Sequence, residues 1–242
     1  MAVVRVYVPD IASRHEPISL PRDEAHHVTQ VLRLGRGAEV TVFDGTGREW
    51  HAQVTEARRH TVMVSLGEET VPAAEPPVRL TLAMAVVKGD TMDGVIRDAT
   101  ALGVSAIAPF RSAHVTVPVR ARSSEATLDR WRRVAVAAAK QCERAVVPKI
   151  AAVASFEQTI TSAADARIVM CVEPARGTAE GAIGARPHSA VLLVGPEGGW
   201  ADAEIAYARI RGATLLTLGP RRLSAALAPV AAISVLWTRW GW

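Results

Sequence analysis

The chain has 242 residues, of which 49% are hydrophobic, and a formal net charge of +4. That length suits one large domain or two small ones with a buried core. No apolar run reaches the roughly 18 residues of a membrane-spanning helix, which argues against a membrane protein. The opening MAVVRVYVPD carries Arg5 within a strand-like alternation, unlike a signal peptide. Cys142 and Cys171 lie outside any CxxC or Cys/His cluster, so we expect reduced cysteines and a cytoplasmic location.

Residues 1–72 are rich in short strands with tight turns. Residues 3–8 predict a strand, and RDEAHHVTQVLRL predicts a short helix that ends at Gly35 and Gly37. The segments AEVTVFDG and REWHAQVTEA alternate on either side of Asp44-Gly45-Thr46-Gly47, which indicates a hairpin. HTVMVSLG predicts a further strand. This pattern favours a small β-barrel, and the proline-rich VPAAEPPV that follows is typical of a linker.

Residues 73–242 have a different pattern, in which buried strands alternate with helices. The predicted strands are RLTLAMAVV, VSAIAPF, ARIVMCV, AVLLVG and ATLLTLG. Helices are expected at about 90–102, 124–145, 201–211 and from 224 to the end. The alternation indicates an α/β domain with a mostly parallel sheet.

The positive charge is concentrated in residues 111–149, which hold nine Lys and Arg against three Asp and Glu. Most of these cations are arginines, whose guanidinium groups bind phosphate in a bidentate manner. A polyanionic partner and a solvated helix face explain this composition equally well.

Two loops follow buried strands and carry Gly-Pro pairs. Gly195-Pro196-Glu197-Gly198-Gly199 comes after AVLLV, and Leu218-Gly219-Pro220-Arg221-Arg222 comes after the next strand. Neither loop matches a P-loop, GxGxxG or GxSxG. Open α/β sheets bind ligands at the carboxyl ends of their strands, where backbone groups of two such loops can match a purine. A plain tight connection is the alternative for Gly195-Pro196. The one close histidine pair, His26-His27, has unsuitable spacing for a shared metal.

The segment LLVGPEGGWADAEI, followed by LTLGPRRL, resembles the C-terminal signature of the SPOUT superfamily of S-adenosylmethionine-dependent RNA methyltransferases. More narrowly, the chain resembles the bacterial ribosomal RNA small subunit methyltransferase E family, which makes N3-methyluridine in 16S ribosomal RNA. The resemblance includes HHVTQVLRLGRGAEVTVFDGTG, KGDTMDGVIRDATALGVSAIAPF and RWRRVAVAAAKQCERAVVPKI, so that it covers nearly the whole chain.

The resemblance implies a fold and a set of partners. Residues 1–72 would form a PUA-like β-barrel that binds RNA, and residues 73–242 a SPOUT-type domain with a C-terminal trefoil knot. S-adenosyl-L-methionine would be the cofactor, and 16S ribosomal RNA in the small subunit the substrate. The protein would be a homodimer that needs neither a membrane nor a metal.

The resemblance also assigns site residues by position. Gln141 and Arg144 match a Gln and an Arg of the central block, and Arg111 and Arg221 join them as catalytic candidates because a cation would stabilise a uracil anion. The expected cofactor-binding residues are Leu193, Val194, Gly195, Pro196, Glu197, Gly198, Gly199, Leu218, Gly219, Pro220 and Leu223.

One segment departs from the family pattern. After Leu-Gly-Pro-Arg the family usually reads Ile-Leu-Arg-Thr-Glu-Thr-Ala, whereas this chain reads Arg222-Leu223-Ser224-Ala225-Ala226-Leu227-Ala228. Polar groups expected near the methyl donor are therefore replaced by small and apolar ones. The alternative function is a catalytically weakened SPOUT-fold RNA-binding protein. A nucleotide-binding α/β enzyme of another kind is disfavoured, because phosphate-binding motifs are missing.

Overall fold

The computed structural model describes residues 4–11, 15–58, 61–88, 90–114, 124–174, 176 and 183–242. The chain divides into two compact units. The N-terminal unit comprises Met1–Ala74 together with Val136–Val147, and the C-terminal unit comprises Glu75–Ala135 together with Pro148–Trp242. Each unit has a sheet of its own.

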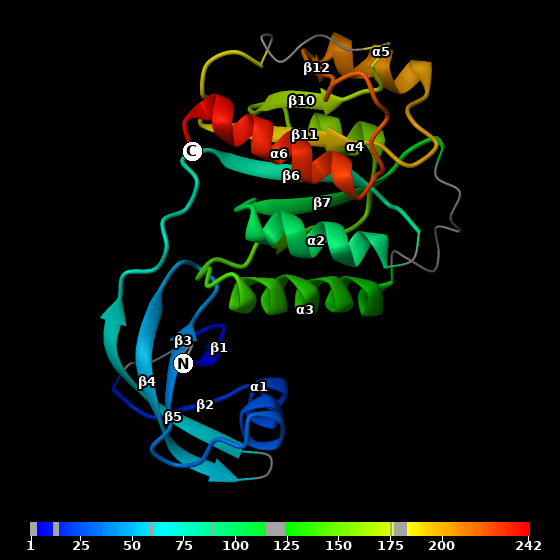
Figure 1. Ribbon diagram of the computed structural model, residues 1–242. Coiled ribbons are helices and arrows are strands. Elements are labelled where there is room, and N and C mark those ends of the chain that lie inside the picture. Colours follow the sequence, from blue (N-terminus) through cyan, green and yellow to red (C-terminus); the bar gives the residue numbers. More distant parts are fainter. Residues whose placement is uncertain are drawn as a thin grey trace. The chain divides into compact units, whose positions relative to one another are not determined.

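The N-terminal unit is built on a five-stranded sheet with the strand order β1-β3-β4-β5-β2 (Figure 1). β1 pairs with β3 in parallel, and the other neighbours pair antiparallel. Alternate valines of the strands pack with the helical segment into one apolar core, since successive side chains of a strand point to opposite faces. The elements are β1 (Val4–Tyr7), β2 (Ile18–Ser19), α1 (Arg22–His26), the π-helix η1 (His27–Val31), β3 (Glu39–Phe43), β4 (Glu49–Arg58) and β5 (Thr61–Thr70).

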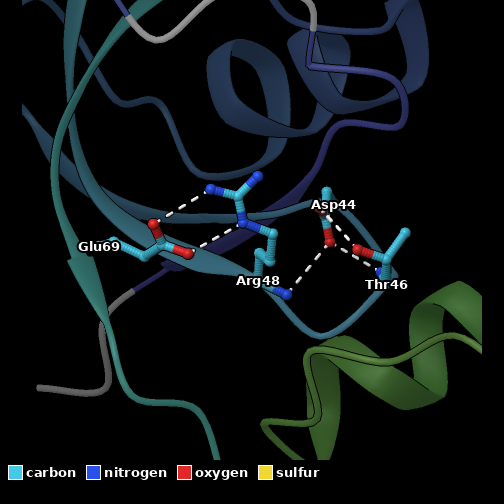
Figure 2. Close-up of polar contacts among 4 residues, drawn as sticks. All are labelled: Asp44, Thr46, Arg48 and Glu69. Carbon is cyan, nitrogen blue, oxygen red and sulfur yellow. Dashed lines mark hydrogen bonds and ion pairs between the residues drawn. The ribbon is translucent and has the colours of Figure 1, made fainter.

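A tight turn joins β3 to β4, as the Asp-Gly-Thr-Gly sequence predicts. The Asp44 carboxylate accepts hydrogen bonds from the Thr46 backbone N–H at 2.7 Å and from the Thr46 hydroxyl at 2.8 Å. It also accepts one from the backbone N–H of Arg48 at 3.3 Å, as Figure 2 shows. The Arg48 guanidinium forms two hydrogen bonds with Glu69, at 2.9 and 3.1 Å, and so ties the turn to the end of β5 (Figure 2).

Residues 136–147 join the N-terminal unit through polar contacts. The Lys140 ammonium forms an ion pair with the Glu24 carboxylate at 2.8 Å. The backbone N–H of Val147 donates to the Gly45 carbonyl at 3.0 Å, so the β3–β4 turn also holds this segment. These long-range contacts could not be read from sequence spacing.

The C-terminal unit contains a seven-stranded sheet in which every neighbouring pair is parallel (Figure 1). The strand order is β12-β10-β11-β6-β7-β8, and β9 pairs with β7 beside this path. The mostly parallel α/β sheet expected from the sequence is thus confirmed. The strands are β6 (Arg79–Ala85), β7 (Ala106–Arg111), β8 (Lys149–Ile150), β9 (Ala154–Ser155), β10 (Arg167–Cys171), β11 (Ser189–Val194) and β12 (Thr214–Leu216).

Helices cover the sheet of the C-terminal unit. Residues of α4 and α5 pack in one apolar cluster with alternate residues of β6, β10 and β11. α6 contacts both β11 and α2 (Figure 1). The Trp237 indole N–H donates to the Leu102 carbonyl at 2.6 Å. The helices are α2 (Thr91–Ala101), α3 (Glu125–Gln141), α4 (Phe156–Thr161), α5 (Asp202–Ile210) and α6 (Leu227–Trp240). The second part of α3 belongs to the N-terminal unit.

Two helix ends differ from the sequence expectation for local reasons. α3 ends at Gln141 instead of about 145, and Glu143 has a φ of 60°, which an α-helix does not allow. α6 begins at Leu227 instead of 224, after a turn in which the Ser224 hydroxyl accepts a hydrogen bond from the Leu227 N–H at 3.2 Å. Within the described ranges, the helices are too short or too polar to cross a bilayer.

Candidate functional site

A cavity of about 420 Å³ opens at the carboxyl edge of the parallel sheet. Three loops surround it, and they follow the adjacent strands β10, β11 and β12. This is the edge at which open α/β sheets bind ligands. The lining residues are Cys171, Val172, Glu173, Pro174, Val194, Gly195, Pro196, Glu197, Gly199, Trp200, Leu218, Arg221, Arg222, Leu223, Ser224, Ala225 and Ala228.

Two glycines of the loop after β11 have separate structural reasons, a close contact at Gly195 and a positive φ at Gly199. A Cβ on Gly195 would lie 2.8 Å from the Trp200 ring, too close for any side chain. Gly199 has a φ of +75°, a conformation that favours glycine, and a Cβ there would collide with the Glu173 carboxylate. Glycine therefore allows close packing against Trp200 at Gly195, and it allows the left-handed backbone of the turn at Gly199, where the Gly199 N–H donates to the Pro196 carbonyl at 3.0 Å.

Gly198 brings a further segment against the same loop. A Cβ at this position would lie 3.1 Å from both the Cβ and the carbonyl oxygen of His114. The His114 Nδ1 lies 3.3 Å from the Gly199 carbonyl oxygen, within reach to donate a hydrogen bond. The segment after β7 is thus in contact with the glycine loop.

The buried carboxylate of Glu204 holds these two segments together. It is only 6% exposed and lies in the first turn of α5. It accepts hydrogen bonds from the Ser112 hydroxyl at 3.1 Å and from the backbone N–H groups of Ala113 and Ala201, each at 3.0 Å. Because a buried carboxylate needs such donors, Glu204 fixes the chain after β7 at the N-terminus of α5.

Charged side chains of both signs line the cavity. Glu173 and Glu197 carry the negative charges, and Arg221 and Arg222 carry the positive ones. Glu197 is exposed, so the carboxylate in the middle of the glycine loop faces the cavity and solvent. Arg222 Nη2 lies 3.9 Å from Glu173 Oε1, at the limit of an ion pair. Such a set of charges suits a zwitterionic ligand.

The segment that departs from the family pattern forms part of the wall. Ser224, Ala225 and Ala228 line the cavity with small side chains, while Leu227 is exposed on α6. The Ser224 hydroxyl accepts the Leu227 N–H, so the serine supports the start of α6. This wall therefore offers the cavity mainly apolar surface and backbone groups.

The cofactor-binding residues expected from the sequence fall into two groups. Seven of them line the cavity: Val194, Gly195, Pro196, Glu197, Gly199, Leu218 and Leu223. Leu193 is fully buried in the core between the sheet and α4 and α5, Gly198 contacts His114, and Gly219 and Pro220 are exposed beside the lining residues.

The four catalytic candidates are distributed over both units. Arg221 lines the cavity, and Arg111 is the exposed last residue of β7. Gln141 and Arg144 belong to the N-terminal unit, where Gln141 is exposed and Arg144 is buried. The Arg144 backbone carbonyl accepts a hydrogen bond from Arg5 Nη2 at 3.2 Å.

Sequence reasoning missed the third loop of the cavity, Cys171–Pro174. The strand before it was recognised in ARIVMCV, but its position beside β11 depends on strand order, which periodicity does not reveal. Trp200 was missed as well. Its indole N–H donates to the Cys171 carbonyl at 2.6 Å and so joins two of the loops. A tryptophan directly after Gly198-Gly199 was the available signal.

Comparisons with known proteins identify related domains and relatives of this chain. The sequence model of an RNA methyltransferase domain matches residues 74–237, and that of an RNA methyltransferase PUA domain matches residues 20–66. Ribosomal RNA small subunit methyltransferase E of Synechocystis sp. is 34% identical over 222 residues, which cover 90% of this chain and 71% of that protein.

Two solved structures are similar over nearly the whole chain. Ribosomal RNA small subunit methyltransferase E from Neisseria gonorrhoeae, bound to S-adenosyl methionine, has a TM-score of 0.89 at 29% identity, covering 99% of this chain and 98% of that one. A protein from Legionella pneumophila in complex with the bound cofactor SAM has a TM-score of 0.91 at 27% identity, covering 98% of both chains. The fold, the domain matches and these relatives show that the chain belongs to the ribosomal RNA small subunit methyltransferase E family of RNA methyltransferases.

Proposed function

We propose that this protein is an S-adenosylmethionine-dependent methyltransferase that methylates N3 of a uridine in the 16S ribosomal RNA of the small subunit. The observation that carries the proposal is the cavity between the loops after β10, β11 and β12, in a chain whose relatives include ribosomal RNA small subunit methyltransferase E proteins and a structure bound to S-adenosyl methionine. The N3 position of uridine rests on the family resemblance of the sequence.

The cavity fits the cofactor by several physical criteria. Its volume of about 420 Å³ lies in the range of small-molecule sites, and its wall combines apolar side chains with loop backbone. Glu173 Oε2 is buried and accepts no hydrogen bond within the described part of the chain, so its charge is little compensated there. Arg221 and Arg222 can take the ligand's carboxylate, and Glu173 and Glu197 its positive charges.

The reaction requires mainly orientation from this chain. The bound cofactor supplies a methyl group activated by a sulfonium. Uracil N3 releases its proton to water as the N–CH₃ bond forms, and the chain must hold N3 in line with that methyl group. Arg221, which lines the cavity, is the first candidate to stabilise negative charge on the uracil. Arg111, Gln141 and Arg144 are proposed to contact the RNA or the target uridine.

We further infer the assembly in which the site operates. The outward face of α6 lacks charge over three turns, and a second copy of this chain is the partner whose chemistry fits such a face, consistent with the homodimer that the resemblance implies. Trp237 and Trp240 are buried within the unit, whereas Trp242 is 51% exposed. The exposed or half-buried residues of this face are Leu227, Val230, Ala231, Ser234, Val235 and Thr238.

The dimer proposal is tested by light scattering at micromolar concentration. Ala231→Arg places a charge on the face and should give a monomer, whereas Arg239→Ala, at the end of the same helix, should leave the dimer intact. A monomeric mass for the unaltered protein would refute the proposal.

The trefoil knot is inferred in the same way from the resemblance, and it would bring together the three loops that surround the cavity.

RNA binding is proposed for the PUA-like domain of residues 1–72 and for the basic segment 111–149. The six charges of net excess in that segment favour an RNA backbone. Residues 115–123 of the segment lie outside the described residues.

A cytoplasmic location follows from the proposed ribosomal substrate, and cell fractionation tests it.

Mass spectrometry of ribosomal RNA tests the substrate. In a strain that lacks this protein, N3-methyluridine should disappear from the small subunit and return on complementation. Purified protein should also transfer a labelled methyl group to small subunits from that strain. Unchanged N3-methyluridine would refute the substrate assignment.

The alternative is a catalytically weakened RNA-binding protein, and the apolar wall at Ser224, Ala225 and Ala228 is the observation that favours it. Calorimetry with S-adenosylmethionine separates the two functions. Micromolar or tighter binding supports the enzyme, whereas RNA binding without cofactor binding supports the alternative.

A further inference from the structure

Glu173 is the cavity-lining carboxylate that lies deepest in the protein. It follows β10, and its side chain is 21% exposed, whereas Glu197 on the opposite loop is exposed. Glu173 Oε2 is buried and accepts no hydrogen bond from the residues that the structure describes. An unpaired buried carboxylate oxygen is costly, so such an atom needs a compensating ligand or ion.

The neighbouring loop is shaped around this carboxylate. Gly199 leaves the space that Glu173 Oε1 occupies, because a Cβ on Gly199 would collide with it. The positive φ of Gly199 favours glycine at the same position. The Glu173 carboxylate therefore lies directly against the loop after β11.

Few charges compensate Glu173 among the described residues. On the loop after β12, Arg222 Nη2 lies 3.9 Å from Glu173 Oε1, and the Arg222 side chain is 69% exposed. Cys171, Val172 and Trp200 supply an apolar surrounding on the other sides of the cavity. A charge in such a surrounding interacts more strongly than one in water, so Glu173 should distinguish ligands by their charge more than the exposed Glu197 does.

We propose that Glu173 recognises the positive charge of the cofactor's sulfonium and thereby distinguishes the methyl donor from the demethylated product. This inference rests on the proposed function. Methyl transfer breaks the S–CH₃ bond, the bonding electrons stay on sulfur, and the sulfonium becomes a neutral thioether. The amino, carboxyl, ribose and adenine groups stay the same. A carboxylate beside the sulfur therefore binds the donor better than the product and favours product release.

The test is a comparison of two dissociation constants, those of S-adenosylmethionine and S-adenosylhomocysteine, by calorimetry. Glu173→Gln keeps the size of the side chain and removes its charge. We expect this variant to lose affinity for S-adenosylmethionine by about tenfold more than for S-adenosylhomocysteine, which corresponds to one weakened charge interaction. Asp165→Asn also removes one negative charge, but at an exposed position outside the cavity. This control should leave both dissociation constants unchanged.

A second variant tests the charge of Glu173 by removing its neighbouring cation. Arg222→Ala removes the cation near Glu173 and should raise the preference for S-adenosylmethionine over its product. Thermal unfolding of each variant shows that the fold is retained, and the ratio of the two constants is insensitive to a uniform loss of affinity.

The outcomes separate this inference from the proposed function. If the unaltered protein binds neither compound, the proposed function fails. If it binds both and Glu173→Gln leaves the ratio unchanged, the proposed function stands and the role of Glu173 is refuted. Equal losses for both compounds would also refute it, because Glu173 would then contact a group that donor and product share.

Discussion

The indole N–H of Trp200 donates a 2.6 Å hydrogen bond to the backbone carbonyl of Cys171. The bond joins the loop after β11 to the loop after β10, and both line the cavity. The Trp200 ring also stacks on Phe110 with centroids 5.9 Å apart and planes inclined by 7°. One side chain thus fixes the spacing of two cavity loops against the core.

Trp200→Phe should weaken both the fold and the cavity. The change leaves the Cys171 carbonyl without its donor, and we expect a loss of about 1–3 kcal/mol in the free energy of unfolding. Chemical denaturation measures this loss, and calorimetry should show weaker S-adenosylmethionine binding. Trp242→Phe is the matched control, since Trp242 is 51% exposed and the change should cost less than about 0.5 kcal/mol. Equal stability of the two variants would contradict the bridging role.

Gly198→Val should separate the glycine loop from the segment after β7. The Cβ of the new side chain would lie 3.1 Å from the Cβ and the carbonyl oxygen of His114, and overpacking of this kind costs about 1–3 kcal/mol. Because the loop lines the cavity on both sides of Gly198, cofactor affinity should fall by about tenfold or more. Gly35→Ala, at a position with open space around it, should change neither property. Normal binding by a folded Gly198→Val protein would show that the loop is not the cofactor site.

The arginines of α3 should contribute unequally to RNA binding. Arg130 donates to Asp90 and Asp93 at 2.9 Å, and Arg132 donates to two acidic residues of its own helix at 2.7 Å. Arg133 donates only to a backbone carbonyl among the described residues, so its charge is not compensated in this way.

Arg133→Ala should therefore weaken RNA binding more than Arg130→Ala and should reduce the slope of log affinity against log salt by about one if Arg133 contacts a phosphate. Filter binding at several salt concentrations measures the slope. Both variants should unfold within about 1 kcal/mol of the parent, because exposed ion pairs contribute little. Identical salt slopes for the parent and Arg133→Ala would show that the α3 face carrying Arg133 is a solvated helix surface without a phosphate contact.

The buried thiol of Cys171 should make stability depend on alkaline pH. Burial raises the pKa of this thiol from 9.0 to about 12. The native state then keeps a proton that the unfolded state releases above pH 9, so the free energy of unfolding falls as pH rises from 9 to 12. The contribution of this group is fully present below pH 9, and its loss amounts to about 1.4 kcal/mol per pH unit within the window.

Denaturation at several pH values, with Cys171→Ala as the comparison, measures this dependence. The variant should lose the part of the slope that belongs to the thiol. Iodoacetamide at pH 8 should leave Cys171 unmodified in the native protein. In denaturant the Cys171 thiol should react with it. Modification of native Cys171 at pH 8 would contradict its burial.

Much of the cavity was predictable from local sequence. Unbroken apolar runs predicted the parallel strands, and Gly195 to Gly199 and Leu218 to Leu223 marked the loops that follow two of them. The physical reason is that parallel strands place their carboxyl ends at one edge, so a strand followed by a glycine-rich loop already indicates a ligand site. The family pattern of the sequence supplied the nature of the ligand.

Other elements were missed although a signal existed. α4 begins with a capping box in which the Ser155 hydroxyl accepts the Gln158 N–H at 3.2 Å and the Gln158 side chain accepts the Ser155 N–H at 2.9 Å. The Ser-x-x-Gln spacing is a recognised helix start.

The two-residue strands β2, β8 and β9, in contrast, are too short to show any periodicity.

The tertiary structure alone decided which loops meet. The order β12-β10-β11 places Cys171–Pro174 beside the two predicted loops, and it brings Glu173 against Gly199. It also joins Glu204 to Ser112 across 92 residues of sequence. The sequence by itself determined where strands, helices and glycine-rich loops occur, because those depend on residues within a few positions of one another. The partners of buried charges depend on strand order and helix packing, which arise from long-range burial and leave no local pattern.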